Sequence, residues 1–163
     1  MGKFEIRHTI HVPVDGFYDQ VFLNEAFNEA MYKDELGFGY ELLEWDAATG
    51  KRRSRIEPKV DVPAVIRKIL GDSVSFVEAG IYEAAANRYE FRVIPNTLAE
   101  KLKITGTMVV RAQGDHTERI VNFDVQAKIF GVGKVLEAFI EKSTRERYDQ
   151  TAEFTNRYLS RQS

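Results

Sequence analysis

The sequence predicts an α+β domain in which a curved antiparallel sheet of about seven strands wraps around a long C-terminal helix. Alternating apolar and polar residues, the pattern of half-buried strands, recur along most of the chain. Two short helical segments follow the first such run, and residues 134–161 contain neither glycine nor proline and therefore predict one helix. At 163 residues, 44% of them hydrophobic, the chain is expected to form a single domain over residues 1–163.

Each element is predicted from its local pattern. The first strand is expected at residues 3–12, and Pro13 ends it. Asp15 is the expected N-cap of the first short helix, because its side chain can accept hydrogen bonds from free backbone N–H groups. The second short helix is expected to follow Asn24. The sequence Ala-Ala-Thr-Gly at 47–50 predicts a hairpin turn. The other strands are expected at 40–46, 51–59, 73–83, 87–94, 102–113 and 117–128, and the other helices at 63–70 and 134–161.

Composition excludes several classes of function. The 23 basic and 25 acidic residues give a net charge of -2, which offers no general attraction to nucleic acid, so no nucleic-acid partner is expected. The chain has no cysteine, which excludes disulfides, thiolate metal sites and cysteine nucleophiles. No stretch approaches the roughly 20 apolar residues of a membrane span. We therefore expect a soluble, cytoplasmic protein.

No motif of a catalytic or cofactor site is present. The chain contains three histidines, His8, His11 and His116, whose spacing does not match a helical metal-binding motif. A nucleophile elbow, a phosphate-binding glycine loop and a dinucleotide fingerprint are also missing from the sequence. We therefore assign no catalytic residue, no metal and no cofactor.

The final helix has an unusual face. At about 1.5 Å per residue it would extend roughly 40 Å and cross the whole sheet. One narrow sector of its helical wheel is apolar at both ends but polar in the middle, and it holds Leu136, Ile140, Ser143, Arg147, Thr151, Phe154 and Tyr158. Either Arg147 packs its stem and leaves its guanidinium in water, or the helix stands away from the sheet and its polar residues orient a guest in a cavity.

The concave face of the sheet would supply the opposite wall of such a cavity. Gly80 and Gly106 are expected to mark bulges or bends that deepen the curvature. Ordinary core packing is the alternative role for each wall candidate, because aromatic residues at strand spacing usually fill space. The candidates are Trp45, Phe76, Tyr82, Tyr89, Phe91, Met108, Val110, Phe123 and Val125.

Two ionisable residues and one basic cluster have alternative interpretations. His8 and Glu78 share the apolar phase of their strands and are possible polar groups of the cavity, although a bulge that turns Glu78 outward is the simpler expectation. The cluster KRRSR contains Lys51, Arg52, Arg53 and Arg55. It is either a solvated strand face or a site of transient contact with anionic lipid headgroups.

The order of elements, together with GVGKVLEAFI at the start of the last helix, resembles the START-like superfamily, also called the SRPBCC, helix-grip or birch-pollen-allergen fold. The stretches VPAVIRKILG (62–71) and FGVGKVLEAFIEK (130–142) are similar to an uncharacterised bacterial family within it. The resemblance implies a cavity between sheet and helix for a lipid, sterol-like or polyketide-like molecule. The turn AATGK has a single glycine, unlike the glycine-rich loop of the plant allergens, so a phosphate-binding role there is not supported.

These observations lead to three hypotheses for function. The first is binding or transport of a hydrophobic small molecule in the internal cavity, without catalysis. The second is a cyclase, dehydratase or hydrolase in the same cavity, in which His8, Glu78, Tyr82 and Arg147 converge on one bound atom. The third is a protein-interaction module with a filled core, which predicts an interior without a continuous void.

Overall fold

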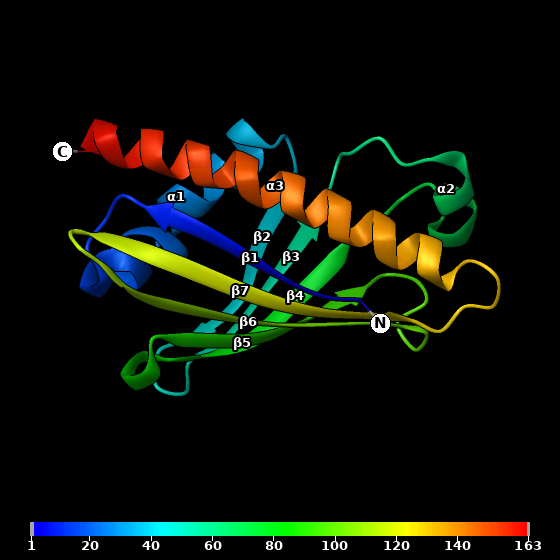
Figure 1. The fold of residues 1–163 in the computed structure, drawn as a ribbon, viewed down its shortest axis with the longest axis horizontal. Coiled ribbons are helices and arrows are strands. Elements are labelled where there is room, and N and C mark those ends of the chain that lie inside the picture. Colours follow the sequence, from blue (N-terminus) through cyan, green and yellow to red (C-terminus); the bar gives the residue numbers. More distant parts are fainter. Residues whose placement is uncertain (1, 163) are drawn as a thin grey trace.

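The structure is a computed structural model that describes residues 2–162 and contains the predicted order of elements (Figure 1). The observed bounds differ from the predicted bounds by at most three residues. The strands are β1 (Gly2–Ile10), β2 (Gly39–Asp46), β3 (Lys51–Glu57), β4 (Phe76–Glu83), β5 (Arg88–Pro95), β6 (Leu102–Gln113) and β7 (His116–Ala127). The helices are α1 (Glu25–Glu29), α2 (Ala64–Leu70) and α3 (Gly133–Gln162).

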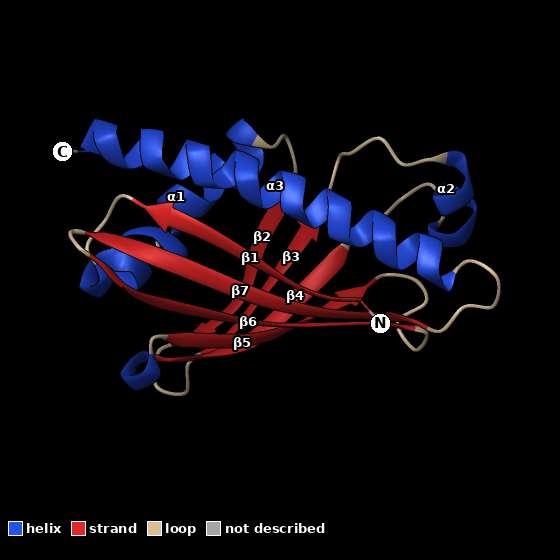
Figure 2. Ribbon diagram, viewed as in Figure 1, coloured by secondary structure: helices blue, strands red, loops and turns tan. Residues whose placement is uncertain are grey.

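The seven strands form one antiparallel sheet in the order β1-β7-β6-β5-β4-β3-β2. From β2 to β7 each strand pairs with the next one along the chain, and short segments connect these strands except between β3 and β4, where the connection contains α2. In Figure 2 the strands β2 to β4 run across the direction of β5 to β7, and α3 lies along one side of this twisted sheet. The sheet therefore curls around the helix, which confirms the predicted helix-grip architecture.

The chain between β1 and β2 holds the short helical segments. Helix α1 follows Asn24, as predicted. Asn24 is its N-cap, because the side-chain oxygen accepts a hydrogen bond from the backbone N–H of Phe27 at 3.0 Å. The prediction for Asp15 is wrong: this residue lies inside a 3₁₀ turn, Val14–Gly16, and caps no helix. A π-helical turn at Tyr18–Phe22 takes the place of the first predicted helix.

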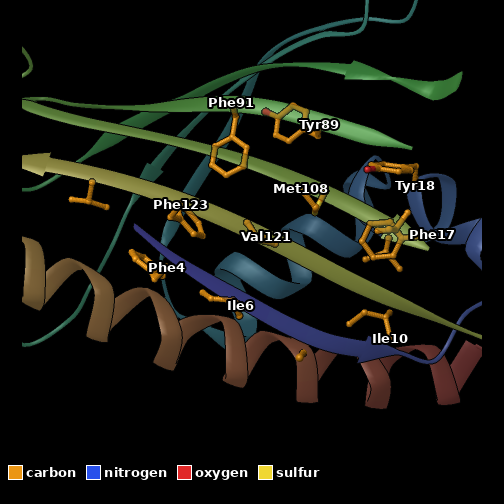
Figure 3. Packing of buried hydrophobic residues seen from close by; sticks show 14 of the residues in the cluster. Phe4, Ile6, Ile10, Phe17, Tyr18, Tyr89, Phe91, Met108, Val121 and Phe123 are labelled. Carbon is orange, nitrogen blue, oxygen red and sulfur yellow. The ribbon is translucent and has the colours of Figure 1, made fainter. Parts of the chain in front are cut away.

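The main hydrophobic core lies on the face of the sheet toward α3, and it includes residues of β1, β5, β6 and β7, of the helical segments after β1, and of α2. Figure 3 shows side chains of β1, β5, β6 and β7 gathered on the side of the sheet that faces α3. Phe4 of β1 stacks on Phe123 of β7 at a centroid distance of 5.1 Å, and Leu136 of α3 is fully buried. The helix therefore leans on the edge of the sheet formed by β1 and β7, and the strands β3 to β5 curve away from it.

Gly80 and Gly106 do not form bulges, because the pairing of β4, β5 and β6 continues through both positions. Each glycine instead makes room for an aromatic ring. A Cβ atom at Gly106 would overlap the Phe91 ring, and one at Gly80 would overlap the Tyr89 ring. The backbone approaches these rings closely, which only glycine permits. The register shift in the sheet lies in β2 instead, between Leu42 and Glu44.

Candidate functional site

A cavity of about 290 Å³ lies between α3 and the strands that curve away from it. Its wall is built from β3 to β7, from the helical segments that follow β1, and from the middle of α3. Most of the lining side chains are apolar, including Phe76, Val93, Ile104 and Phe139. A cavity that is mostly apolar and contains a few polar groups is the usual form of a small-molecule site.

The exposed residues of the cavity wall mark its mouth. Within the described chain, four lining residues are exposed: Val60, Asp72, Asn96 and Thr97. All four flank α2, either in the segments before and after it or in the turn between β5 and β6. The Thr97 hydroxyl donates to the Leu70 carbonyl oxygen at 3.2 Å, which connects this turn to the end of α2. The cavity therefore reaches solvent beside α2.

The structure brings many of the predicted site residues together around the cavity. The predicted polar stripe of α3 lies against the void at mid-length, as the second interpretation of this helix requires, and Glu78 of β4 faces it from the sheet. The predicted residues that line the cavity are Phe76, Phe91, Met108, Phe123, Ile140, Ser143, Arg147 and Thr151, together with Glu78.

Seven of the predicted cavity residues lie outside its wall. Trp45 pairs in register with Arg52 and so shares the concave face, but it lies at the end of β2, is 38% exposed, and contacts Tyr82. Tyr82 packs on Tyr18, beyond the end of the cavity. Also outside the lining are Tyr89, Val110, Val125, Leu136 and His8. For the residues on strands, the predicted placement on the wall is wrong because the period of a strand gives a face and not a position along it.

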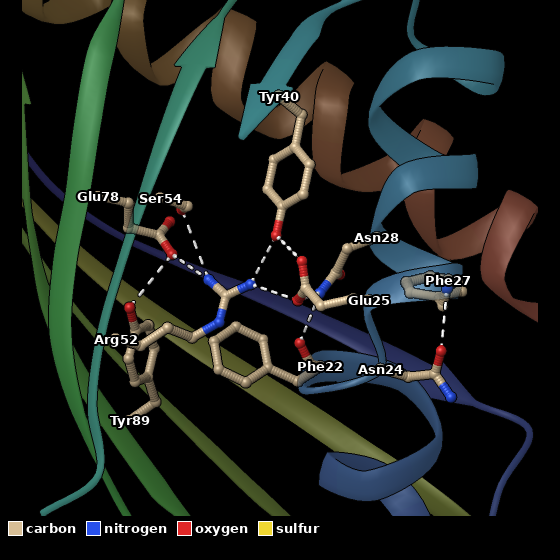
Figure 4. A network of polar contacts seen from close by, with 10 residues as sticks. All are labelled: Phe22, Asn24, Glu25, Phe27, Asn28, Tyr40, Arg52, Ser54, Glu78 and Tyr89. Atoms are coloured by element: carbon tan, nitrogen blue, oxygen red, sulfur yellow. Dashed lines mark hydrogen bonds and ion pairs between the residues drawn. The ribbon is translucent and has the colours of Figure 1, made fainter. Parts of the chain in front are cut away.

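A buried polar network surrounds Arg52, which is 3% exposed (Figure 4). Its Nη2 donates to a carboxylate oxygen of Glu25 at 3.1 Å and to the Tyr40 hydroxyl at 2.9 Å. The Tyr40 hydroxyl in turn donates to Glu25 at 2.6 Å. The Arg52 guanidinium also lies over the Phe22 ring, 5.0 Å from its centroid. Such a fully partnered charge fixes β3 to α1.

Glu78 faces the interior from β4, and the expected bulge that would turn it outward is not present, since β4 pairs continuously with both neighbours. One of its carboxylate oxygens lies 4.0 Å from Nη1 of Arg52 and accepts a hydrogen bond from the Tyr89 hydroxyl at 3.3 Å. Burial raises the pKa of Glu78, although Arg52 and Arg147 oppose this change. The carboxyl group is therefore a titratable group in the cavity wall.

Arg119 of β7 is a cavity residue that the sequence analysis did not identify. It is 8% exposed, and its Nη2 donates to Nδ1 of His8 at 3.3 Å. On its other side, His8 Nε2 lies 2.7 Å from a carboxylate oxygen of Asp149, so the ring donates to Asp149 and accepts from Arg119. Burial lowers the pKa values of both His8 and Arg119. His8 therefore holds Arg119 from behind the cavity.

Tyr148 of α3 brings Arg119 and Arg147 to the same part of the cavity. The Cζ atom of Arg119 lies 5.1 Å from the centroid of the Tyr148 ring, and that of Arg147 lies 5.7 Å from it. Arg147 also lies over the Phe76 ring at 5.9 Å. Burial raises the pKa of Tyr148, so its hydroxyl stays protonated. The aromatic faces support both cations, but they do not neutralise them.

The basic cluster of β3 is divided between the two faces of the sheet. Lys51, Arg53 and Arg55 are exposed, and Arg53 and Arg55 lie within ion-pair distance of Glu44 and Glu57. Arg52 points into the interior. The prediction of one surface cluster is therefore wrong for Arg52, since alternate residues of a strand point to opposite faces.

Neither a clustered metal site nor a membrane-spanning helix occurs within residues 2–162. Among these residues, no group of three or more histidine, aspartate or glutamate side chains could hold a metal ion. None of the helices in this part of the chain is both long enough and apolar enough to cross a membrane.

Comparison with solved structures shows what the fold is similar to. A protein from Thermus thermophilus, TTHA0849, has a TM-score of 0.68 and 16% identity, with 99% of each chain covered. The Zhui aromatase/cyclase from Streptomyces sp. R1128 has a TM-score of 0.68 and 14% identity over 96% of this chain and 94% of its own. A START superfamily protein from Mycobacterium smegmatis has a TM-score of 0.61 and 15% identity over 96% and 98%. The predicted START-like fold is therefore confirmed.

Comparison of sequences gives the family. No curated protein matches the chain. A family model described as "Protein of unknown function (DUF2505)" matches residues 5–159, which is most of the sequence. The protein therefore belongs to the DUF2505 family and has the START-like, helix-grip fold.

Proposed function

We propose that the protein binds a hydrophobic small molecule in the cavity between the sheet and α3, and that it acts as a carrier, sensor or presenter. The observation that carries this proposal is the mostly apolar void of about 290 Å³ at the middle of α3. The void also argues against the hypothesis of an interaction module with a filled core. An apolar cavity of about 150 Å³ already admits benzene in another protein, so this space is sufficient for a small ligand.

Burial of the ligand's apolar surface would supply most of the affinity, at roughly 25 cal/mol per Å². The polar groups in the middle of α3, Ser143, Arg147 and Thr151, would orient the ligand because they face the same void. The similarity to an aromatase/cyclase and to a START superfamily protein supports a lipid, sterol-like or polyketide-like molecule as the ligand class.

Ligand access requires a part of the wall that moves. The segment around α2 is the best candidate because all of the exposed lining residues flank it. Ile66 and Leu70 bury one face of α2, and Gly71 follows with a φ of +87°. A short helix that is attached through a few buried side chains and ends in a glycine can move away as a unit.

The proposal is tested with the neutral fluorophore N-phenylnaphthylamine, whose emission rises in an apolar site. Ser143→Trp places a large side chain in the cavity and is expected to abolish most of the fluorescence gain. Lys142→Trp is the matched control, because Lys142 is the preceding residue of the same helix and is exposed. Equal fluorescence gain in the wild type and in Ser143→Trp would reject the cavity as the binding site.

A second candidate function, catalysis on a polyketide or lipid in the same cavity, is favoured by Glu78. A buried carboxyl group with a raised pKa that faces a cavity is suited to acid–base chemistry. The expected convergence of His8 and Tyr82 on the same atom is not observed, because neither lines the cavity. Glu78→Gln separates the two functions by mass spectrometry of the bound molecule: a carrier holds the same molecule in the wild type and in the variant, whereas an enzyme accumulates unconverted substrate only in the variant.

Two further features bear on where the protein acts in the cell, namely the absence of cysteine and the exposed basic residues of β3. A chain without cysteine suits the reducing cytoplasm, and we propose this location for the protein. Contact with a membrane surface would depend on Lys51, Arg53 and Arg55 alone. Cosedimentation with anionic and with neutral vesicles tests that contact, and equal recovery with both would argue against it.

A further inference from the structure

The interior contains more positive charge than its carboxylates neutralise. Three guanidinium groups line the cavity, those of Arg52, Arg119 and Arg147. The two carboxylates near them, Glu25 and Glu78, lie within ion-pair distance of Arg52. Within residues 2–162, no carboxylate lies within ion-pair distance of Arg119 or Arg147. Even with both carboxylates ionised, three cations face two anions, and the surplus lies on the side of Arg119 and Arg147.

The contacts of the Arg119 guanidinium show that its positive charge has no anionic partner within residues 2–162. Its Nε is buried and has no hydrogen-bond partner in the described chain. The guanidinium contacts the neutral acceptor Nδ1 of His8 and the face of the Tyr148 ring. A buried guanidinium stays charged at neutral pH even when its pKa is lowered. A buried charge without a counterion is costly, and an anion bound next to Arg119 would offset this cost.

The position of the surplus defines where an anionic group would lie. Arg119 and Arg147 both lie beside the Tyr148 ring and both line the cavity, Arg119 from β7 and Arg147 from α3. Phe139 lines the cavity eight residues before Arg147, about 12 Å along the helix axis. The wall between these two positions contains Ile140 and Ser143. The mouth beside α2 lies beyond Phe139, on the side away from Arg147.

We propose that the ligand is an amphiphilic monoanion, with a carboxylate between Arg119 and Arg147 and an apolar body that extends toward α2. This inference rests on the proposed function and specifies the chemistry of its ligand. The planar forks of two guanidinium groups match a carboxylate, and the orphan Nε of Arg119 supplies a free donor. A monoanion is favoured because, with both carboxylates ionised, the three guanidinium groups exceed them by a single charge.

The test compares ligands that share one chain and differ in head group. Decanoate, decanol and decyl phosphate compete with the neutral fluorophore N-phenylnaphthylamine at pH 7.5. Decanoate is expected to bind at least about tenfold more tightly than decanol, because the carboxylate gains charge-assisted hydrogen bonds. Equal affinity of decanoate and decanol overturns the inference and leaves the proposed function standing. Tighter binding of decyl phosphate than of decanoate overturns the choice of a monoanion.

Variants locate the head group. Arg119→Met and Arg147→Gln are each expected to reduce the ratio of decanoate to decanol affinity by about tenfold. Arg145→Gln is the control, because Arg145 lies on the same helix but is exposed and pairs with Glu141. Arg147 is only half-buried, so its variant provides a folded protein should Arg119→Met unfold. An unchanged ratio in both variants overturns the inference, and failure of the fluorophore itself to bind overturns the proposed function.

Discussion

Arg52 and Arg119 are both buried at the wall of the same cavity, but they differ in the groups that contact them. On the side of α1, Arg52 is held by Glu25, Tyr40 and Glu78 in a closed network (Figure 4). On the side of β7, Arg119 is also buried but has a neutral histidine and an aromatic face as partners. Burial alone therefore does not distinguish a structural charge from a ligand-binding charge; the partners do.

This difference in partners also distinguishes an arginine that stabilises the fold from one that can bind a ligand. A charge that is fully partnered inside the protein contributes to the fold and leaves no free donor for a ligand. A charge with an orphan donor at a cavity wall gains its partner when a ligand binds, at the cost of stability in the empty state. Substitutions on the two sides should therefore have opposite effects on stability and binding.

The largest expected effect is the loss of stability in Arg52→Met. This substitution leaves Glu25 and Glu78 without their shared cation, and loss of one partner from a buried pair costs about 3 kcal/mol of unfolding free energy. Urea denaturation measures the change. Arg53→Met is the control, since Arg53 is the next residue of β3 and is exposed, and its cost should stay below about 0.5 kcal/mol. Equal losses in the two variants would show that the network has no structural role.

Arg119→Met should have a smaller effect on stability, although Arg119 is also buried. No carboxylate loses its counterion, and an apolar side chain of similar length replaces a desolvated charge. The unfolding free energy of the empty protein is expected to change by less than about 1 kcal/mol or to increase, as seen when buried ions are replaced by apolar groups. A loss as large as that of Arg52→Met would contradict the comparison between the two sides.

Most of the fold could be predicted from the sequence because it depends on local patterns. The strand period placed β5, β6 and β7 within one residue of their observed bounds, and the second short helix was expected after Asn24, where α1 begins. Asp15 was not a cap because the chain forms a 3₁₀ turn there. The void could not be predicted, because the helical wheel of α3 is compatible both with a helix that touches the sheet and with a helix that stands away from it.

The candidate site was only partly predictable. Arg119 shares the strand phase of Val121 and Phe123, and Arg52 shares that of Ile56. The alternation along each strand therefore indicates that both arginines point inward. Arginine is rarely buried without a partner, and the partner of Arg52 on α1 is brought near only by tertiary structure. Which of two inward arginines is partnered depends on contacts between elements distant in sequence, and a local pattern carries no such information.

Glu78→Gln tests the partnered side through its pH dependence. Because the pKa of Glu78 is raised above 4.5 in the folded protein, the folded state holds its proton more tightly than the unfolded state does. The wild type therefore loses stability as pH rises from 4.5 through the folded pKa. Glu78→Gln stays neutral, so its stability relative to the wild type should increase over this interval. Thermal melts across pH 4 to 8 measure the difference, and parallel profiles would mean that Glu78 titrates normally.

The smallest expected effect concerns His8, which holds Arg119 from behind. Burial is the main cause that lowers the pKa of His8 below 6.5, and the Arg119 charge adds to it, while Asp149 opposes it. Below pH 6.5 the unfolded chain binds a proton that the folded protein does not, so the stability of the wild type should decrease as pH falls toward the folded pKa. His8→Asn, whose amide oxygen can still accept from Arg119, should lose this dependence. His11→Asn is the control, because His11 is exposed and stacks on His116. If His8→Asn retains the wild-type slope between pH 5 and 7, the ring is not the neutral acceptor that positions Arg119.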